Sequence, residues 1–169
     1  MYNPPLNDRD YNLVSLIRQT RDAVIKARER ELAHIGISSI QASLLSILKE
    51  IGNKATPAEI SRRLVREPHS VSALLNRMEK KGLIRKIKDL PRKNMIRVTM
   101  TQKGKTVYHH STKRVSVHEI MSTLNEDEKK VLHLLLEKLR DKAFKLAGIT
   151  YRLPFSAVLS KQEHSLLIH

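Results

Sequence analysis

Residues 53–105 read NKATPAEISRRLVREPHSVSALLNRMEKKGLIRKIKDLPRKNMIRVTMTQKGK. The Thr-Pro-Ala-Glu box at 56–59 predicts a helix start, because threonine caps helices well and proline is tolerated at the first helical position. A second helix is predicted over 68–81, and two strands over 83–88 and 95–101 predict a β-hairpin around a polar loop. Two short helices followed by a hairpin predict a winged helix-turn-helix within a mainly α fold.

The charge of this segment indicates its partner. It contains 15 Lys or Arg and 4 Asp or Glu, a net +11 out of +15 for the whole chain. Positive charge attracts the phosphates of DNA and RNA and anionic lipid alike, so charge alone does not choose among them. On a compact helix-helix-hairpin unit, the same excess favours double-stranded DNA.

Long amphipathic helices are predicted on both sides of this unit, over 8–34, 102–124 and 126–147. They carry more apolar surface than the small winged unit can cover, so we expect a two-fold homodimer. The expected domains are an N-terminal dimerisation helix (1–36), the winged helix-turn-helix (37–101), C-terminal dimerisation helices (102–148) and a tail of unassigned role (149–169).

The composition excludes several classes of function. The chain has no cysteine, which excludes disulfides, thiol redox sensing and thiolate zinc sites. His109 and His110 are adjacent and diverge on a helix, so we expect no metal site. The nucleotide-binding, zinc-protease and serine-hydrolase motifs are missing, so we expect neither an enzyme nor a bound cofactor.

The expected location of the chain is the cytoplasm. The sequence contains no apolar run of about 18 residues, so no membrane span is predicted. The N-terminus also lacks the charged and then apolar pattern of a signal peptide.

The helix over 68–81 has a face suited to the major groove. Its apolar residues share one side, and its opposite side is polar, small and mostly free of acids. A polar face is also what any surface helix shows, but its place between a capped helix and a basic hairpin favours DNA contact. The wing tip, stiffened by Pro91, can enter the minor groove or lie on phosphate. The predicted DNA-binding residues are His69, Ser70, Ser72, Asn76, Arg77, Lys80, Arg92 and Lys93. The predicted phosphate-backbone contacts are Lys54, Arg62, Arg63, Lys86 and Lys88.

Two runs carry a family resemblance: VSALLNRMEKKGLI at 71–84, and the stretch from Asp89 through VTMTQKG at 98–104. With the predicted six-helix order, they make residues 10–147 similar to the MarR family of transcriptional regulators. The resemblance implies a homodimer whose first and last two helices interlock, with two winged domains across a palindromic operator. It also implies that Asp89 starts the wing and that Arg77 lies near DNA.

The wing departs from the family pattern. Relatives commonly place an Asp and, two residues later, an Arg at the tip, where this chain has Arg92 and Asn94. The usual tip arginine therefore has no counterpart, and Arg92 or Lys93 would replace it.

Many members of the family bind phenolic or other anionic ligands between the dimer helices and the winged domain. The resemblance thus implies a ligand-responsive repressor, whose recognition helices must lie ~34 Å apart to reach successive major grooves. An effector that prefers another spacing would release the operator. The alternative is an architectural or RNA-binding winged-helix protein without regulation, which would discriminate little between sequences.

Overall fold

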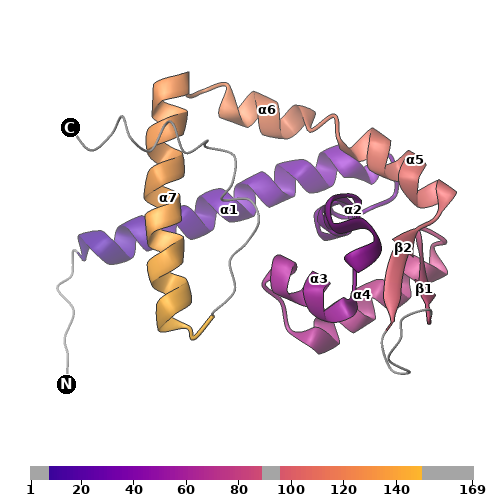
Figure 1. The fold of residues 1–169 in the computed structure, drawn as a ribbon. Helices are drawn as coiled ribbons and strands as arrows, with labels where there is room; N and C mark the ends of the chain where they lie inside the picture. Colours follow the sequence, from indigo (N-terminus) through magenta and orange to yellow (C-terminus); the bar gives the residue numbers. More distant parts are fainter. Residues whose placement is uncertain (1–7, 89–95, 150–169) are drawn as a thin grey trace.

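The chain folds into α-helices and one antiparallel β-hairpin, as predicted (Figure 1). This computed structural model describes residues 8–88 and 96–149. Its elements are, in order, α1 (Arg9–Ala33), α2 (Ser39–Ile51), the 3-10 turn η1 (Gly52–Lys54), α3 (Pro57–Leu64), α4 (Pro68–Lys80), β1 (Ile84–Ile87), β2 (Arg97–Met100), α5 (Gln102–Ser111), α6 (Val115–Met121) and α7 (Glu126–Leu146).

The winged unit closes around one apolar core. The strands of its hairpin pair from Ile84↔Met100 to Ile87↔Arg97. The backbone N–H of Val98 also donates to the carbonyl of Ala55 at 2.8 Å, which joins the hairpin to the segment before α3. The largest fully buried side chains are Leu32, Leu44, Leu45, Ile60, Leu75, Met78, Leu83, Ile84, Val71 and Val98.

Local capping residues start two helices of this unit, α2 and α3. Ser38 and Gln41 form a reciprocal capping box at the start of α2. Thr56 accepts from the backbone N–H of Glu59 at 3.2 Å, as expected. The Glu59 carboxylate does not complete the predicted box; it binds the guanidinium groups of Arg62 and Arg63 at 2.6 and 2.8 Å. These bonds join two charged groups, whereas the missing bond of the box would join the carboxylate to a neutral backbone N–H.

The single helix predicted over 102–124 is wrong, because α5 ends at Ser111 and α6 begins at Val115. Arg114, between them, has a left-handed backbone (φ 49°). The first turn of α6 is capped by the Glu31 carboxylate of α1, which accepts from the N–H groups of Val115 and Ser116 at 2.9 and 3.1 Å. The apolar spacing continues across the break, so the sequence pattern did not reveal it.

The start of α5 packs closely against the turn after α4. Thr101 caps α5 by accepting from the Gly104 N–H at 3.0 Å, and its hydroxyl donates to the Gly82 carbonyl at 2.6 Å. A Cβ on Gly104 would lie 2.0 Å from the carbonyl oxygen of Leu83. Only glycine permits this approach, which explains its place in the motif.

The flanking helices α1 and α7 leave much of their apolar surface uncovered. Figure 1 shows α7 at the end of the molecule away from the hairpin. The α7 helix starts with a capping box of Asn125 and Glu128, is followed by Gly148 with a left-handed backbone (φ 67°), and has no buried residue. The exposed large hydrophobic residues on these two helices are Tyr11, Leu13, Val14, Leu16, Ile17, Val131, Leu132, Leu135, Leu136, Leu139 and Leu146.

Within the described ranges, no lone helix has the length and apolar character to cross a membrane; only α1 and α2 together pass such a test, and they meet at a bend of 80°.

Candidate nucleic-acid interface

The helix α4 presents the predicted polar face. Four apolar side chains, Val71, Leu74, Leu75 and Met78, are buried against the core and set the rotation of the helix. Ser70 is half-buried. The exposed residues of the opposite face and its flanks are His69, Ser72, Ala73, Asn76, Arg77 and Lys80.

Lys86 lies against the α4 helix. Successive side chains of a strand point to opposite faces, so Lys86 shares the face of buried Ile84. Its ammonium group lies 3.0 Å from the Glu79 carboxylate and donates to the side-chain oxygen of Asn76. Hydrogen bonds from the Lys86 side chain and backbone hold the pKa of Glu79 below its ordinary value. This predicted phosphate contact is therefore already engaged within the protein.

The two arginines of α3 differ in exposure. The Arg63 side chain is only 17% exposed and binds Glu59 at 2.8 Å and Glu50 at 2.7 Å, so this predicted phosphate contact is engaged within the protein. Arg62 also pairs with Glu59, but its side chain is 55% exposed. A hydrogen bond from Arg63 and a further one from Arg62 lower the pKa of Glu59, although burial opposes the shift. Arg63 thus stabilises the α2–α3 packing.

The remaining predicted contacts divide into described and undescribed residues. Lys54 and Lys88 are exposed, in keeping with a role in phosphate binding. Arg92 and Lys93 at the wing tip lie outside the described residues, as do Asp89 and Asn94.

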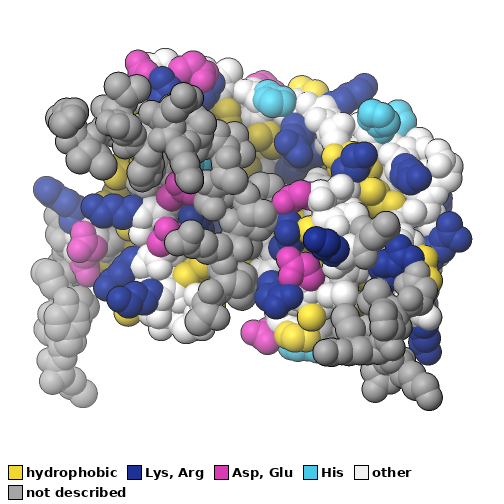
Figure 2. Space-filling model, in the orientation of Figure 1, with side chains coloured by type: hydrophobic (Ala, Val, Ile, Leu, Met, Phe, Trp, Pro, Cys, Tyr) yellow, Lys and Arg dark blue, Asp and Glu magenta, His cyan; other side chains and the backbone are white. Residues whose placement is uncertain are grey.

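The sequence analysis did not name two exposed cations, Arg85 of β1 and Lys105 of α5. Strand alternation could have found Arg85, because it lies on the face opposite Ile84. Figure 2 shows Lys and Arg side chains, without acidic ones among them, over the part of this face that carries α5 and the hairpin. This part of the surface is electrostatically suited to phosphate.

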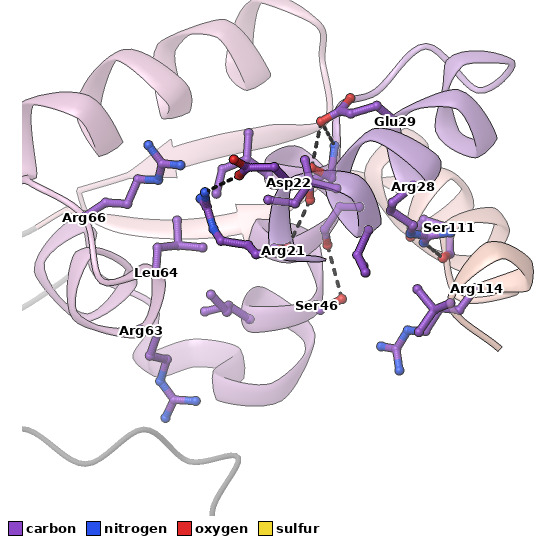
Figure 3. A pocket seen from close by; sticks show the side chains of 18 residues that line it. Arg21, Asp22, Arg28, Glu29, Ser46, Arg63, Leu64, Arg66, Ser111 and Arg114 are labelled. Atoms are coloured by element: carbon purple, nitrogen blue, oxygen red, sulfur yellow. Dashed lines mark hydrogen bonds and ion pairs between the residues drawn. The ribbon is translucent and has the colours of Figure 1, made fainter. Parts of the chain in front are cut away.

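A crevice of about 870 Å³ lies between α1, the α2 and α3 helices of the winged unit, and the turn between α5 and α6 (Figure 3). Arg28 from α1 donates to the Ser111 carbonyl and pairs with Glu31 at 2.7 Å. Arg66 and Arg114 also line the crevice, and neither has an acidic partner among the residues that the structure describes. The same described residues contain no group of three or more His, Cys, Asp or Glu that could hold a metal ion.

Glu31 of α1 contacts Arg28, which lines the crevice, and the first residues of α6. Burial raises its pKa, but hydrogen bonds from Arg28, Ser116 and the Val115 N–H outweigh this effect, so the pKa falls from 4.5 to about 2. A second carboxylate of α1, that of Glu29, accepts from the backbone and hydroxyl of Ser39 at 2.8 and 2.7 Å. One short stretch of α1 therefore caps both α2 and α6.

Comparison with known proteins identifies the family. The profile of the MarR family matches residues 35–91. The organohalide-sensing transcriptional regulator RdhR, in its 2,4-dichlorophenol-bound form, is 32% identical over 86% of this chain and 89% of its own, with a TM-score of 0.77. This chain belongs to the MarR family. The winged helix-turn-helix of a transcriptional regulator, predicted from the sequence, is thereby confirmed.

Two structures with DNA share the fold. A mutant MarR from E. coli in complex with operator DNA is 21% identical, with a TM-score of 0.74, over 80% of this chain and 99% of its own. The S. aureus MepR–DNA complex is 22% identical, with a TM-score of 0.71, over 76% and 96%. No functionally curated protein matched the chain.

Proposed function

We propose that this MarR-family chain is a ligand-responsive repressor that binds a palindromic operator as a homodimer, without catalytic activity. One observation carries the proposal. The same chain combines an exposed, acid-poor face on α4 with two long helices, α1 and α7, that each carry several exposed large hydrophobic side chains. The first feature suits DNA and the second suits another copy of the chain.

In this proposal α4 enters the major groove. Asn76 and Arg77 would contact base edges, because amide and guanidinium groups match the hydrogen-bonding patterns there. His69, Ser70, Ser72 and Lys80 would support them, and the wing residues Arg92 and Lys93 would reach the minor groove or its phosphates. Lys54, Arg62 and Lys88 are the more available backbone contacts, since Arg63 and Lys86 are engaged within the protein. The DNA-bound MarR and MepR structures support this placement.

The dimer would bury the exposed stripes of α1 and α7. We propose the division expected from the sequence: dimerisation segments at 1–36 and 102–148 around a winged domain at 37–101. Burying one exposed leucine contributes about 1.5–3 kcal/mol, so several such residues on each copy can hold a stable interface. The two α4 helices would then lie ~34 Å apart, one turn of the duplex.

The arginine-lined crevice is the proposed effector site. Arg66 and Arg114 offer positive charge without a bound carboxylate, which favours an anionic ligand. The dichlorophenol bound to RdhR supports an aromatic ligand of this type. The crevice borders α1, α2 and the α5–α6 turn, so a bound ligand would alter how the winged domain sits on the dimer helices.

The test is binding to the DNA upstream of the chain's own gene, scanned in fragments at two salt concentrations against random competitor DNA. A protected palindrome of dimer length is expected. Equal affinity for every fragment would replace the repressor with an architectural or RNA-binding protein. On the protected fragment, Asn76→Ala or Arg77→Ala should lower specific binding by roughly 1–3 kcal/mol per half-site, against a Lys145→Ala control.

A further inference from the structure

A side-chain cluster at the base of the wing holds one base-facing residue in a single orientation. Lys86 of β1 donates to the side-chain oxygen of Asn76 on α4. The same ammonium lies 3.0 Å from one Glu79 oxygen, and the Lys86 backbone N–H donates to the other at 3.1 Å. Lys86 is thus held at two points by Glu79 and can keep its third contact, to Asn76, in place.

Burial and charge explain why this cluster persists. The Lys86 side chain is 23% exposed, because strand alternation directs it to the α4 side of β1. Glu79 is the only acidic residue in α4, and Lys86 neutralises it next to the surface proposed to meet phosphate. A lysine placed this way is poorly available to the DNA backbone.

We infer that Lys86 is a positioning residue that sets which base edge Asn76 reads, an inference that rests on the proposed DNA-binding function. A free asparagine pairs with adenine by accepting from N6 and donating to N7. In this structure Lys86 holds the oxygen of Asn76 towards β1, so the amide nitrogen, which donates hydrogen, is the group left to face the groove. Guanine, which presents the acceptors O6 and N7, is the matching base.

The inference differs measurably from the simple role of Lys86 as a phosphate contact. Removing a phosphate contact lowers affinity uniformly across sequences and reduces the slope of log affinity against log salt by about 1. Removing a positioning residue changes the preferred base at one position and leaves that slope nearly unchanged. Lys88, exposed just beyond β1, is the matched lysine control.

The experiment is selection of bound duplexes from a randomised DNA library by the full chain, followed by sequencing. Asn76→Ala marks the base position that Asn76 reads, by relaxing it. We expect guanine there with the wild-type chain. Lys86→Met, combined with Glu79→Gln so that no freed carboxylate repels DNA, should shift the preference towards adenine by about tenfold, the scale of one bidentate contact. Lys86→Arg, which keeps a donor, should restore guanine, and Lys88→Met should lower only the salt slope.

The outcomes separate this inference from the function on which it rests. If the wild-type chain enriches no sequence, the proposed function fails and the inference with it. If it enriches a palindrome with adenine at the Asn76 position, the inference alone is overturned. An unchanged base preference in the Lys86→Met/Glu79→Gln variant, with a salt slope lower by about 1, would return Lys86 to the phosphate contacts.

Discussion

The winged unit and the helices around it use the same leucine, isoleucine and valine side chains with opposite results. Among residues 8–88 and 96–149, all buried hydrophobic residues except Leu32 lie between Ile37 and Val98. In the flanking helices, by contrast, α7 has no buried residue over its full length. The exposed leucines of the described chain all lie on α1 and α7. A helical apolar stripe shows that a partner exists, but not whether that partner belongs to the same copy of the chain.

The largest effect is expected from placing charges among the exposed leucines of α7. Leu135→Asp with Leu139→Asp would place two carboxylates in the proposed interface, where burial of a charge is highly unfavourable. We expect the dimer to dissociate, with a loss of at least about 4 kcal/mol in dimerisation, roughly a thousandfold in the dissociation constant. Analytical ultracentrifugation measures this change. Lys130→Asp, on the opposite side of α7, should stay dimeric, and a dimeric double variant would mean that the stripe has another partner.

The next largest effect is expected from adding a side chain at Gly104, where the start of α5 packs against Leu83 of the winged unit. Gly104→Ala places a Cβ 2.0 Å from the backbone oxygen of Leu83, which requires the backbone to shift. We expect a loss of about 3 kcal/mol in the free energy of unfolding, measured by urea titration. Gly36→Ala is the control, because it meets no atom within 4 Å and pays only for its left-handed backbone, about 1 kcal/mol. Equal losses would show that the junction opens without cost.

Neutralising Glu31 tests the link from α1 to α6. Glu31→Gln weakens the cap of α6 and the pair with Arg28, so about 2 kcal/mol of unfolding free energy should be lost at pH 7. The folded pKa of about 2 lies below the ordinary 4.5, so the charge stabilises the fold above pH 4.5 and ceases to do so as the pH falls towards 2.

The difference between the wild-type chain and the Glu31→Gln variant should therefore shrink over that pH range, as followed by urea unfolding at each pH. Glu119→Gln, exposed on α6, is the control and should change little. A difference that stays constant from pH 7 to pH 2.5 would assign the loss to packing instead of charge.

The smallest effect is expected from removing single cations of the winged unit, the exposed Lys54 or the ion-paired Arg63. Lys54→Gln should lower the slope of log affinity against log salt by about 1, because Lys54 is exposed and available to phosphate. Arg63→Gln should lower it by less than half as much, because Glu50 and Glu59 hold this side chain. Fluorescence anisotropy with one labelled duplex over a salt series measures both slopes, and equal slopes would mean that Arg63 exchanges its acidic partners for phosphate.

Local signals predicted the parts of the fold that depend on neighbours in sequence. The starts of α2, α3, α5 and α7 follow from capping residues no more than three positions away, and the exposed face of α4 follows from the spacing of its buried residues. The capping box at Thr56 forms only in part, because the guanidinium of Arg62, one helical turn away, binds the Glu59 carboxylate in place of the Thr56 backbone N–H.

The helical stripes, the caps, the hairpin and the cationic excess of the winged unit can be read from the sequence, because each depends on residue type and on spacings within a few positions. The break between α5 and α6, the enclosure of Arg63 by two carboxylates and the contact of Lys86 with Asn76 follow from how the chain packs in three dimensions. These features join residues 10 to 85 positions apart, or 4 apart on a packed helix. They form only where folding brings two side chains within hydrogen-bonding distance, and local sequence spacing does not predict that distance.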